Sequence, residues 1–197
     1  MLAYERQYFG DLTLKNATIR KRFKHGWAKG IPTISLQEWR IEPVKIIRYD
    51  QYLFAQSDFM EKSIIFHKKA TYAVSKERLT EVLLHEMIHA YEALLRINFN
   101  NIPEGENVVQ YLMGYLTLKI YDSLGAKFKT IFEFISDSRF WVDGHSILFV
   151  LKSFDLDIRL KRPLGTILGY ERDDYLDIRE DTNLESLLSQ LREEVWK

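Results

Sequence analysis

The 197-residue chain contains no cysteine, and this absence excludes several kinds of site. Disulfides, thiolate zinc sites, zinc ribbons and cysteine nucleophiles all need a sulfur that the chain does not have. Any metal site must therefore be built from histidine nitrogens and carboxylate oxygens.

Net charge and long apolar runs are absent as well. Lys+Arg and Asp+Glu both number 28, so net charge indicates no class of partner. No run approaches 18 apolar residues, and the first residues form no signal-peptide core. We therefore expect a cytoplasmic protein without membrane contact. The hydrophobic content of 46% is that of a globular chain, and we expect a single domain over residues 1–197.

The clearest motif is His85-Glu86-Met87-Ile88-His89, an H-E-x-x-H pattern. Histidines four residues apart on a helix lie one turn apart on the same face, so His85 and His89 can bind one metal ion. Glu86 lies about 100° round the helix, where it can reach a metal-bound water. The pattern is typical of zinc hydrolases, with two nitrogen ligands and a carboxylate as general base.

The surrounding residues predict a buried helix at about 76–97. Ser75 is a good N-cap, and Glu77 lies in the first turn near the positive end of the helix dipole. The apolar residues form two neighbouring stripes, Leu83, Met87, Ala90 and Leu94 in one and Leu84, Ile88, Tyr91 and Leu95 in the other. A helix apolar over so much of its circumference is buried.

Strands are predicted before this helix, at 44–49 and 63–67, from their β-branched and aromatic residues, and 70–74 is a short strand or a lead-in. A strand edge beside the metal helix can hold a peptide in extended form. His67, at the end of one strand, is a further candidate ligand, although a surface position is the more common role of such a histidine.

The chain after the helix is predicted to be mainly helical over 104–140, packing on the metal helix. Alternation of apolar and charged residues from Phe154 to Lys161 then predicts a strand. A capping box at Thr182 opens a predicted terminal helix, so that 154–197 is a strand followed by a helix.

A basic N-terminal region, residues 12–37, contains no acidic residue. Its lysines and arginines alternate with aromatic residues over 15–29, a pattern that can contact a nucleic-acid backbone and stack bases. The alternative is a solvated basic segment whose aromatic residues enter the core.

A catalytic zinc normally takes three protein ligands and keeps one position for water. Two ligands come from the helix, and the third has several candidates. His145 follows the turn-forming pair Asp143-Gly144. Glu133 forms an E-x-x-x-D pattern like that of gluzincin peptidases, and Glu104 and Glu106 are close enough in sequence.

The motif and its downstream partner resemble the SprT-like (Spartan-type) metalloproteases. The resemblance is carried by Leu84-His85-Glu86-Met87-Ile88-His89-Ala90, by Asp143-Gly144-His145 and by Phe149. It implies an α+β zincin-like fold with strands before the active helix. It also implies His85, His89 and His145 as zinc ligands, Glu86 as general base, and 104–140 as a helical insertion. The implied activity is cleavage of proteins, in several members proteins bound to DNA.

The sequence thus predicts a zinc-dependent endopeptidase in which Glu86 activates a zinc-bound water. One alternative is a gluzincin-type peptidase whose third ligand is Glu133, Glu104 or Glu106. The other is a non-catalytic protein that keeps a zincin scaffold and binds nucleic acid or a protein partner. Glu86 favours the enzyme, because a structural metal site has no use for a general base.

Overall fold

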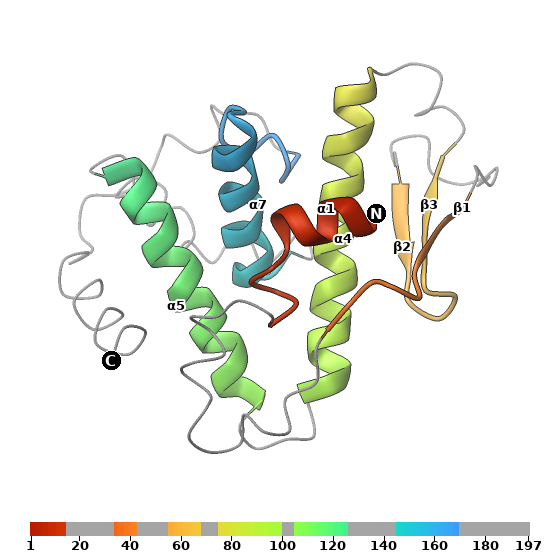
Figure 1. The fold of residues 1–197 in the computed structure, drawn as a ribbon, viewed down its shortest axis with the longest axis horizontal. Coiled ribbons are helices and arrows are strands. Elements are labelled where there is room, and N and C mark those ends of the chain that lie inside the picture. The colour runs from red at the N-terminus through yellow and green to blue at the C-terminus, as the bar shows by residue number, and fades with distance from the viewer. Residues whose placement is uncertain (15–33, 43–54, 68–74, 100–104, 126–144, 170–197) are drawn as a thin grey trace. The chain divides into compact units, whose positions relative to one another are not determined.

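The fold is described from a computed structural model over residues 1–14, 34–42, 55–67, 75–99, 105–125 and 145–169. The chain divides into two compact units, Met1–Asn98 and Phe99–Lys197. The described residues contain four helices and one three-stranded sheet, which confirms the α+β class (Figure 1). The zincin-like fold and the single domain over 1–197 stay predictions.

The sheet of the first unit has the order β1-β3-β2, with β1 at Arg40–Glu42, β2 at Ala55–Asp58 and β3 at Ser63–Phe66. The central strand β3 pairs parallel with β1 and antiparallel with β2. All of β3 is buried, as its apolar sequence predicts. The predicted strand at 63–67 is thereby confirmed, whereas those at 44–49 and 70–74 lie outside the described residues.

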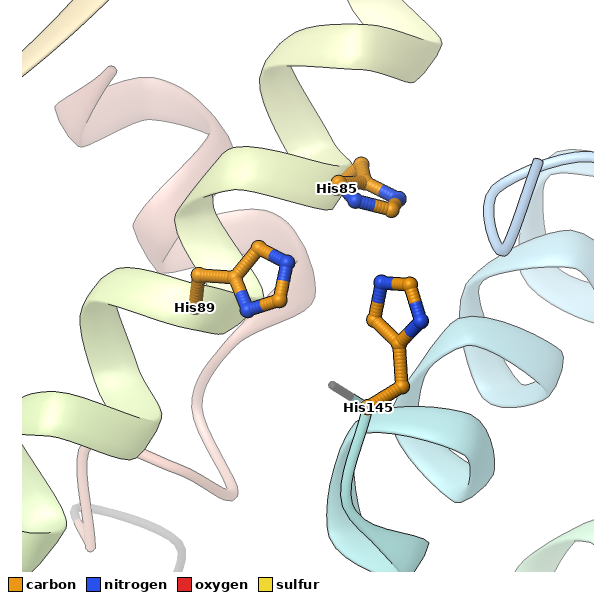
Figure 2. A group of neighbouring side chains, drawn as sticks. All are labelled: His85, His89 and His145. Atoms are coloured by element: carbon orange, nitrogen blue, oxygen red, sulfur yellow. The ribbon is translucent and has the colours of Figure 1, made fainter. Parts of the chain in front are cut away.

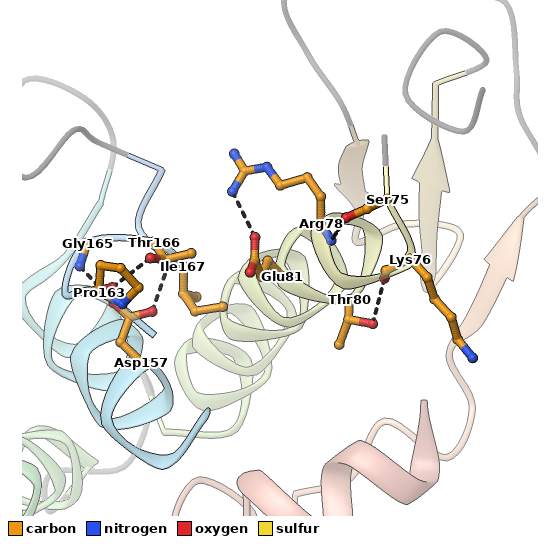
Figure 3. A network of polar contacts seen from close by, with 10 residues as sticks. All are labelled: Ser75, Lys76, Arg78, Thr80, Glu81, Asp157, Pro163, Gly165, Thr166 and Ile167. Carbon is orange, nitrogen blue, oxygen red and sulfur yellow. Dashed lines mark hydrogen bonds and ion pairs between the residues drawn. The ribbon is translucent and has the colours of Figure 1, made fainter. Parts of the chain in front are cut away.

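Helix α4, Lys76–Phe99, confirms the predicted metal helix. Ser75 caps its first turn, because the Ser75 hydroxyl oxygen accepts a hydrogen bond from the Arg78 N–H at 3.1 Å. An ion pair between Arg78 and Glu81 follows on the next turn (Figure 3). The two apolar stripes are also confirmed, since all but Leu94 of their eight side chains are buried.

Helix α1, Leu2–Tyr8, packs on α4 through stacked rings of Phe9 and Tyr91, whose centroids lie 5.0 Å apart. Beside this stack lies the carboxylate of Glu5, which is only 4% exposed. It accepts hydrogen bonds from the Leu36 N–H at 2.8 Å, the Ser35 hydroxyl at 3.2 Å and the Tyr91 hydroxyl.

Three separate parts of the first unit therefore meet at one buried carboxylate: α1, residues 35–36 and α4. Burial, together with the hydrogen bond and the charge of Glu5, raises the pKa of Tyr91. The phenol consequently stays protonated and remains a donor. A buried charge is tolerated here because several donors compensate for its lost hydration.

The second unit contains α5, Gly105–Leu124, and α7, Ile147–Leu160, which contact each other. α5 ends at Gly125, whose φ of 57° lies in the left-handed region that favours glycine. The prediction of a mainly helical segment over 104–140 is confirmed for 105–124. Residues 126–144 lie outside the described part of the chain.

The predicted strand from Phe154 to Lys161 is wrong, because these residues form the second half of α7 and its C-cap. Alternation indicates a strand when the charged residues face water. Here Asp155 and Asp157 are as buried as their apolar neighbours, with exposed fractions of 2% and 0%. The whole run Leu148–Asp157 is buried, so the alternation carries no information about an exposed face.

Asp155 is buried because cations surround it. The Lys152 ammonium, itself fully buried, donates to Asp155 Oδ2 at 2.8 Å. Lys119 of α5 forms an ion pair with Oδ1, and the Arg159 guanidinium lies 3.8 Å from Oδ2. Burial raises the pKa of Asp155, but the charges and hydrogen bonds of Lys152 and Lys119 outweigh it and hold the pKa below its usual value.

Asp157 ties the end of α7 to the turn that follows it. Its two carboxylate oxygens accept hydrogen bonds from the Gly165 N–H at 2.7 Å and the Ile167 N–H at 3.0 Å (Figure 3). The C-cap residue Lys161 has a left-handed φ of 55°. A side chain that satisfies backbone donors in this way fixes the chain beyond the helix.

Several predicted segments lie outside the described residues, namely the basic stretch 15–29 and the terminal helix after Thr182. Among the helices that the structure describes, none is long and apolar enough to cross a membrane.

We expect Tyr91→Phe to lower the free energy of unfolding by about 1.5–3 kcal/mol, because Glu5 loses a charge-assisted hydrogen bond in a buried setting. Denaturant unfolding followed by circular dichroism measures the change. Tyr8→Phe removes the hydroxyl of a half-buried tyrosine that accepts a surface hydrogen bond from Gln7, and it is the matched control, with an expected change below about 0.5 kcal/mol. Equal effects of the two substitutions would contradict the role of Glu5.

We expect Asp155→Asn to destabilise the protein by about 3 kcal/mol at pH 7, because the buried ammonium of Lys152 loses its anion. The pKa of Asp155 in the folded state lies below its unfolded value. The contribution of Asp155 to the free energy of unfolding is therefore present above about pH 4 and is lost as pH falls through the folded pKa. The stability difference between wild type and variant should therefore shrink as the pH falls below about 4. Asp122→Asn, at an exposed position of α5, should show no such difference.

Candidate metal centre

His85 and His89 project from the same side of α4, one turn apart. Their ring centroids lie 5.0 Å apart, and the ring planes are inclined by 73° (Figure 2). Both side chains are partly exposed, whereas their neighbours Leu84, Met87 and Ile88 are buried. The burial of the opposite face of α4 thus leaves the two imidazoles accessible to an ion.

Glu86, between the two histidines, is only 7% exposed. The hydroxyl oxygen of Ser57, on β2, lies 2.9 Å from Glu86 Oε2 and 2.9 Å from the backbone carbonyl oxygen of Glu86. Ser57 was not predicted from the sequence. The two residues are 29 positions apart, and no motif or period connects them.

The surroundings of the Glu86 carboxyl raise its pKa above the ordinary value. Burial raises the pKa of its carboxyl, and the hydrogen bond from Ser57 and the charge of His89 oppose this shift without cancelling it. A cation bound to the neighbouring histidines would act in the opposite direction and favour the carboxylate. Burial of Glu86 therefore increases the affinity of its carboxyl group for a proton, and Ser57 and His89 limit that increase.

Glu92 lies one turn beyond His89 on α4. Its Oε2 atom is 3.8 Å from His89 Nδ1, and the two side chains form an ion pair when His89 is protonated. This neighbour was not predicted either, although the spacing of three residues on a helix was a signal that could have found it.

His145 belongs to the second unit, at the entrance to α7. It directly precedes Ser146, whose hydroxyl oxygen caps the helix by accepting from the Phe149 N–H at 3.2 Å. The imidazole packs on the Phe149 ring, with the centroids 4.4 Å apart. A helix cap and an aromatic neighbour thus position the side chain. Asp143 and Gly144, the predicted turn, lie outside the described residues.

His85, His89 and His145 together form a group that could hold a metal ion (Figure 2). Each offers one ring nitrogen, and these nitrogens all lie within 4.8 Å of one another. The three predicted ligands thus fall in one group, and imidazole nitrogens are donors that zinc commonly takes.

The structure does not test the glutamate ligands, and it places His67 outside the histidine group. Glu104 and Glu133 lie outside the described residues, and the side chain of Glu106, in the first turn of α5, is not described. His67 is buried, with 6% exposed, and it is not part of the histidine group. The surface position considered for His67 is thus wrong, because the burial of β3 extends to this residue, one position beyond the end of the strand.

Comparisons of the chain with protein-family models, with curated proteins and with solved structures give no match. What the chain can do is therefore inferred from the chemistry of its own residues.

We expect zinc to bind with one equivalent per chain and His145→Ala to weaken this binding as much as His89→Ala, by orders of magnitude. Titration with zinc in competition with a chromophoric chelator measures both affinities. His67→Gln is the control, with an unchanged zinc affinity. Wild-type affinity in His145→Ala would exclude His145 as a ligand.

Proposed function

We propose that the protein is a zinc-dependent endopeptidase with His85, His89 and His145 as ligands and Glu86 as general base. The observation that carries the proposal is the group of three imidazoles, two of which flank a buried carboxylate on one helix. Among the described residues the group holds three nitrogen donors. Three protein ligands are typical of catalytic zinc, which keeps a position for water or substrate.

Zinc, when bound, supplies Lewis acidity, which polarises a scissile carbonyl and acidifies water. The protein's own contribution is made by Glu86. A buried carboxyl with a raised pKa holds a proton more readily than an exposed one, which suits a group that takes a proton and then passes it to a leaving amine. With Ser57 on Oε2, the second carboxylate oxygen is the one to receive that proton.

The position of β2 supports a peptide as substrate. β2 is joined to the site through Ser57, and among the described residues it pairs only with β3. A strand beside the site is suited to hold an extended peptide by backbone hydrogen bonds. The resemblance to SprT-like proteases adds DNA-bound proteins as a substrate class. Residues 15–29, proposed to contact DNA, lie outside the described part of the chain.

The burial of Glu86 also favours an enzyme over a non-catalytic metal-binding protein. Burying a carboxylate costs free energy, and a structural metal site would gain nothing from one between its two helical ligands. Carboxyl groups with shifted pKa values cluster at functional sites, so the free-energy cost of burying Glu86 is consistent with a catalytic role.

We expect Glu86→Gln to lower proteolysis of fluorescently labelled casein at least about 100-fold, because the amide cannot accept the proton. The zinc content should stay at one equivalent, as elemental analysis can establish. Glu77→Gln, in the exposed first turn of α4, is the control and should cleave at the wild-type rate. An undiminished rate in Glu86→Gln, after removal of contaminating proteases, would refute the peptidase proposal.

A further inference from the structure

The contact between Ser57 and Glu86 joins the sheet to the metal helix at the proposed general base. Ser57 pairs with Ile64 of β3, and the neighbouring residue Asp58 pairs with Ser63. At the turn after β2, the Asp58 carboxylate accepts hydrogen bonds from the N–H groups of Met60 and Glu61. The strand that carries Ser57 is thus fixed on one side by a ladder and at its end by a side-chain-stabilised turn.

We infer that Ser57 is a positioning residue that sets the direction of the Glu86 carboxylate, an inference that rests on the proposed peptidase function. A glutamate side chain has three rotatable bonds, and burial alone does not select one rotamer. A hydroxyl held on a strand, 2.9 Å from Oε2, does select one. The selection matters because an error of about 1 Å in the placement of a catalytic group can cost 100-fold in rate.

The second contact of the hydroxyl explains why serine suits this position. A serine has one O–H donor, and it lies 2.9 Å from two acceptors, Oε2 and the carbonyl oxygen of Glu86. The hydroxyl can turn from one acceptor to the other without moving its oxygen atom. It therefore keeps an acceptor when the carboxyl group rearranges during turnover, and no unsatisfied donor is left in a partly buried place.

The experiment compares two variants of equal shape. Ser57→Thr keeps the hydroxyl and Ser57→Val replaces it with a methyl group, and both β-branched residues suit a strand. With labelled casein as substrate, we expect Ser57→Val to lower kcat about 10- to 100-fold with KM changed less than about threefold. Ser57→Thr should restore most of kcat. The zinc dissociation constant should stay within about threefold in both, because Ser57 contacts neither His85 nor His89 in these interactions.

Ser35→Ala is the matched control for general loss of stability. Ser35 also donates to a carboxylate, Oε2 of Glu5, from a partly buried position in the same unit. Its removal should lower stability to a similar extent and leave kcat unchanged. Equal losses of kcat in Ser57→Thr and Ser57→Val, or wild-type kcat in Ser57→Val, would overturn the positioning role.

A stability cycle separates this inference from the peptidase proposal. Ser57→Ala should change the unfolding equilibrium constant about tenfold more in the wild-type background than in Glu86→Ala, as expected for a hydrogen bond to a charged group. Additive effects would show that the contact is absent and would overturn the inference by themselves. If the two substitutions are coupled in stability but the wild-type protein cleaves no casein, the contact is present and the peptidase proposal is refuted. The positioning role, which rests on that proposal, would then fail as well.

Discussion

Burial of one face of α4 is the constraint on which the candidate site depends. Leu84, Met87 and Ile88 are excluded from water, so the helix cannot rotate without exposing them. The stacked rings of Phe9 and Tyr91 and the carboxylate of Glu5 lock the same face against α1. Because 3.6 residues make a turn, fixing this face also fixes the direction of His85 and His89.

The predictable part of the site is the part encoded locally. His85, Glu86 and His89 lie within five residues, and helical geometry alone relates their side chains. The same local logic identified Ser75 as the N-cap. His145 is 56 residues beyond His89, and the turn-forming pair before it made it one candidate among several. Only a family resemblance, which no comparison tests, favoured it over the glutamates. Ser57 had no signal at all, because its contact with Glu86 is a product of tertiary structure.

The error over Phe154–Lys161 has the same origin. A sequence pattern shows which residues are charged, but not which charges will be buried with partners. Asp155 and Asp157 are each satisfied by groups that a pattern of period two does not include, namely Lys119 of another helix and the N–H groups of Gly165 and Ile167. Such pairs are costly to break, so tertiary structure overrides the local preference.

The separation of Ser57 from Glu86 along the chain has a consequence for how the protein acquires activity during folding. Helix α4 is a local structure that forms on a short timescale, and its two imidazoles reach their spacing as soon as it does. The contact with β2 requires a loop of 29 residues to close and a strand to pair first. Under the proposed function, two of the three ligands would therefore be in place before the base is aligned. Hydrolytic competence would then have to wait for the tertiary contact between Ser57 and Glu86.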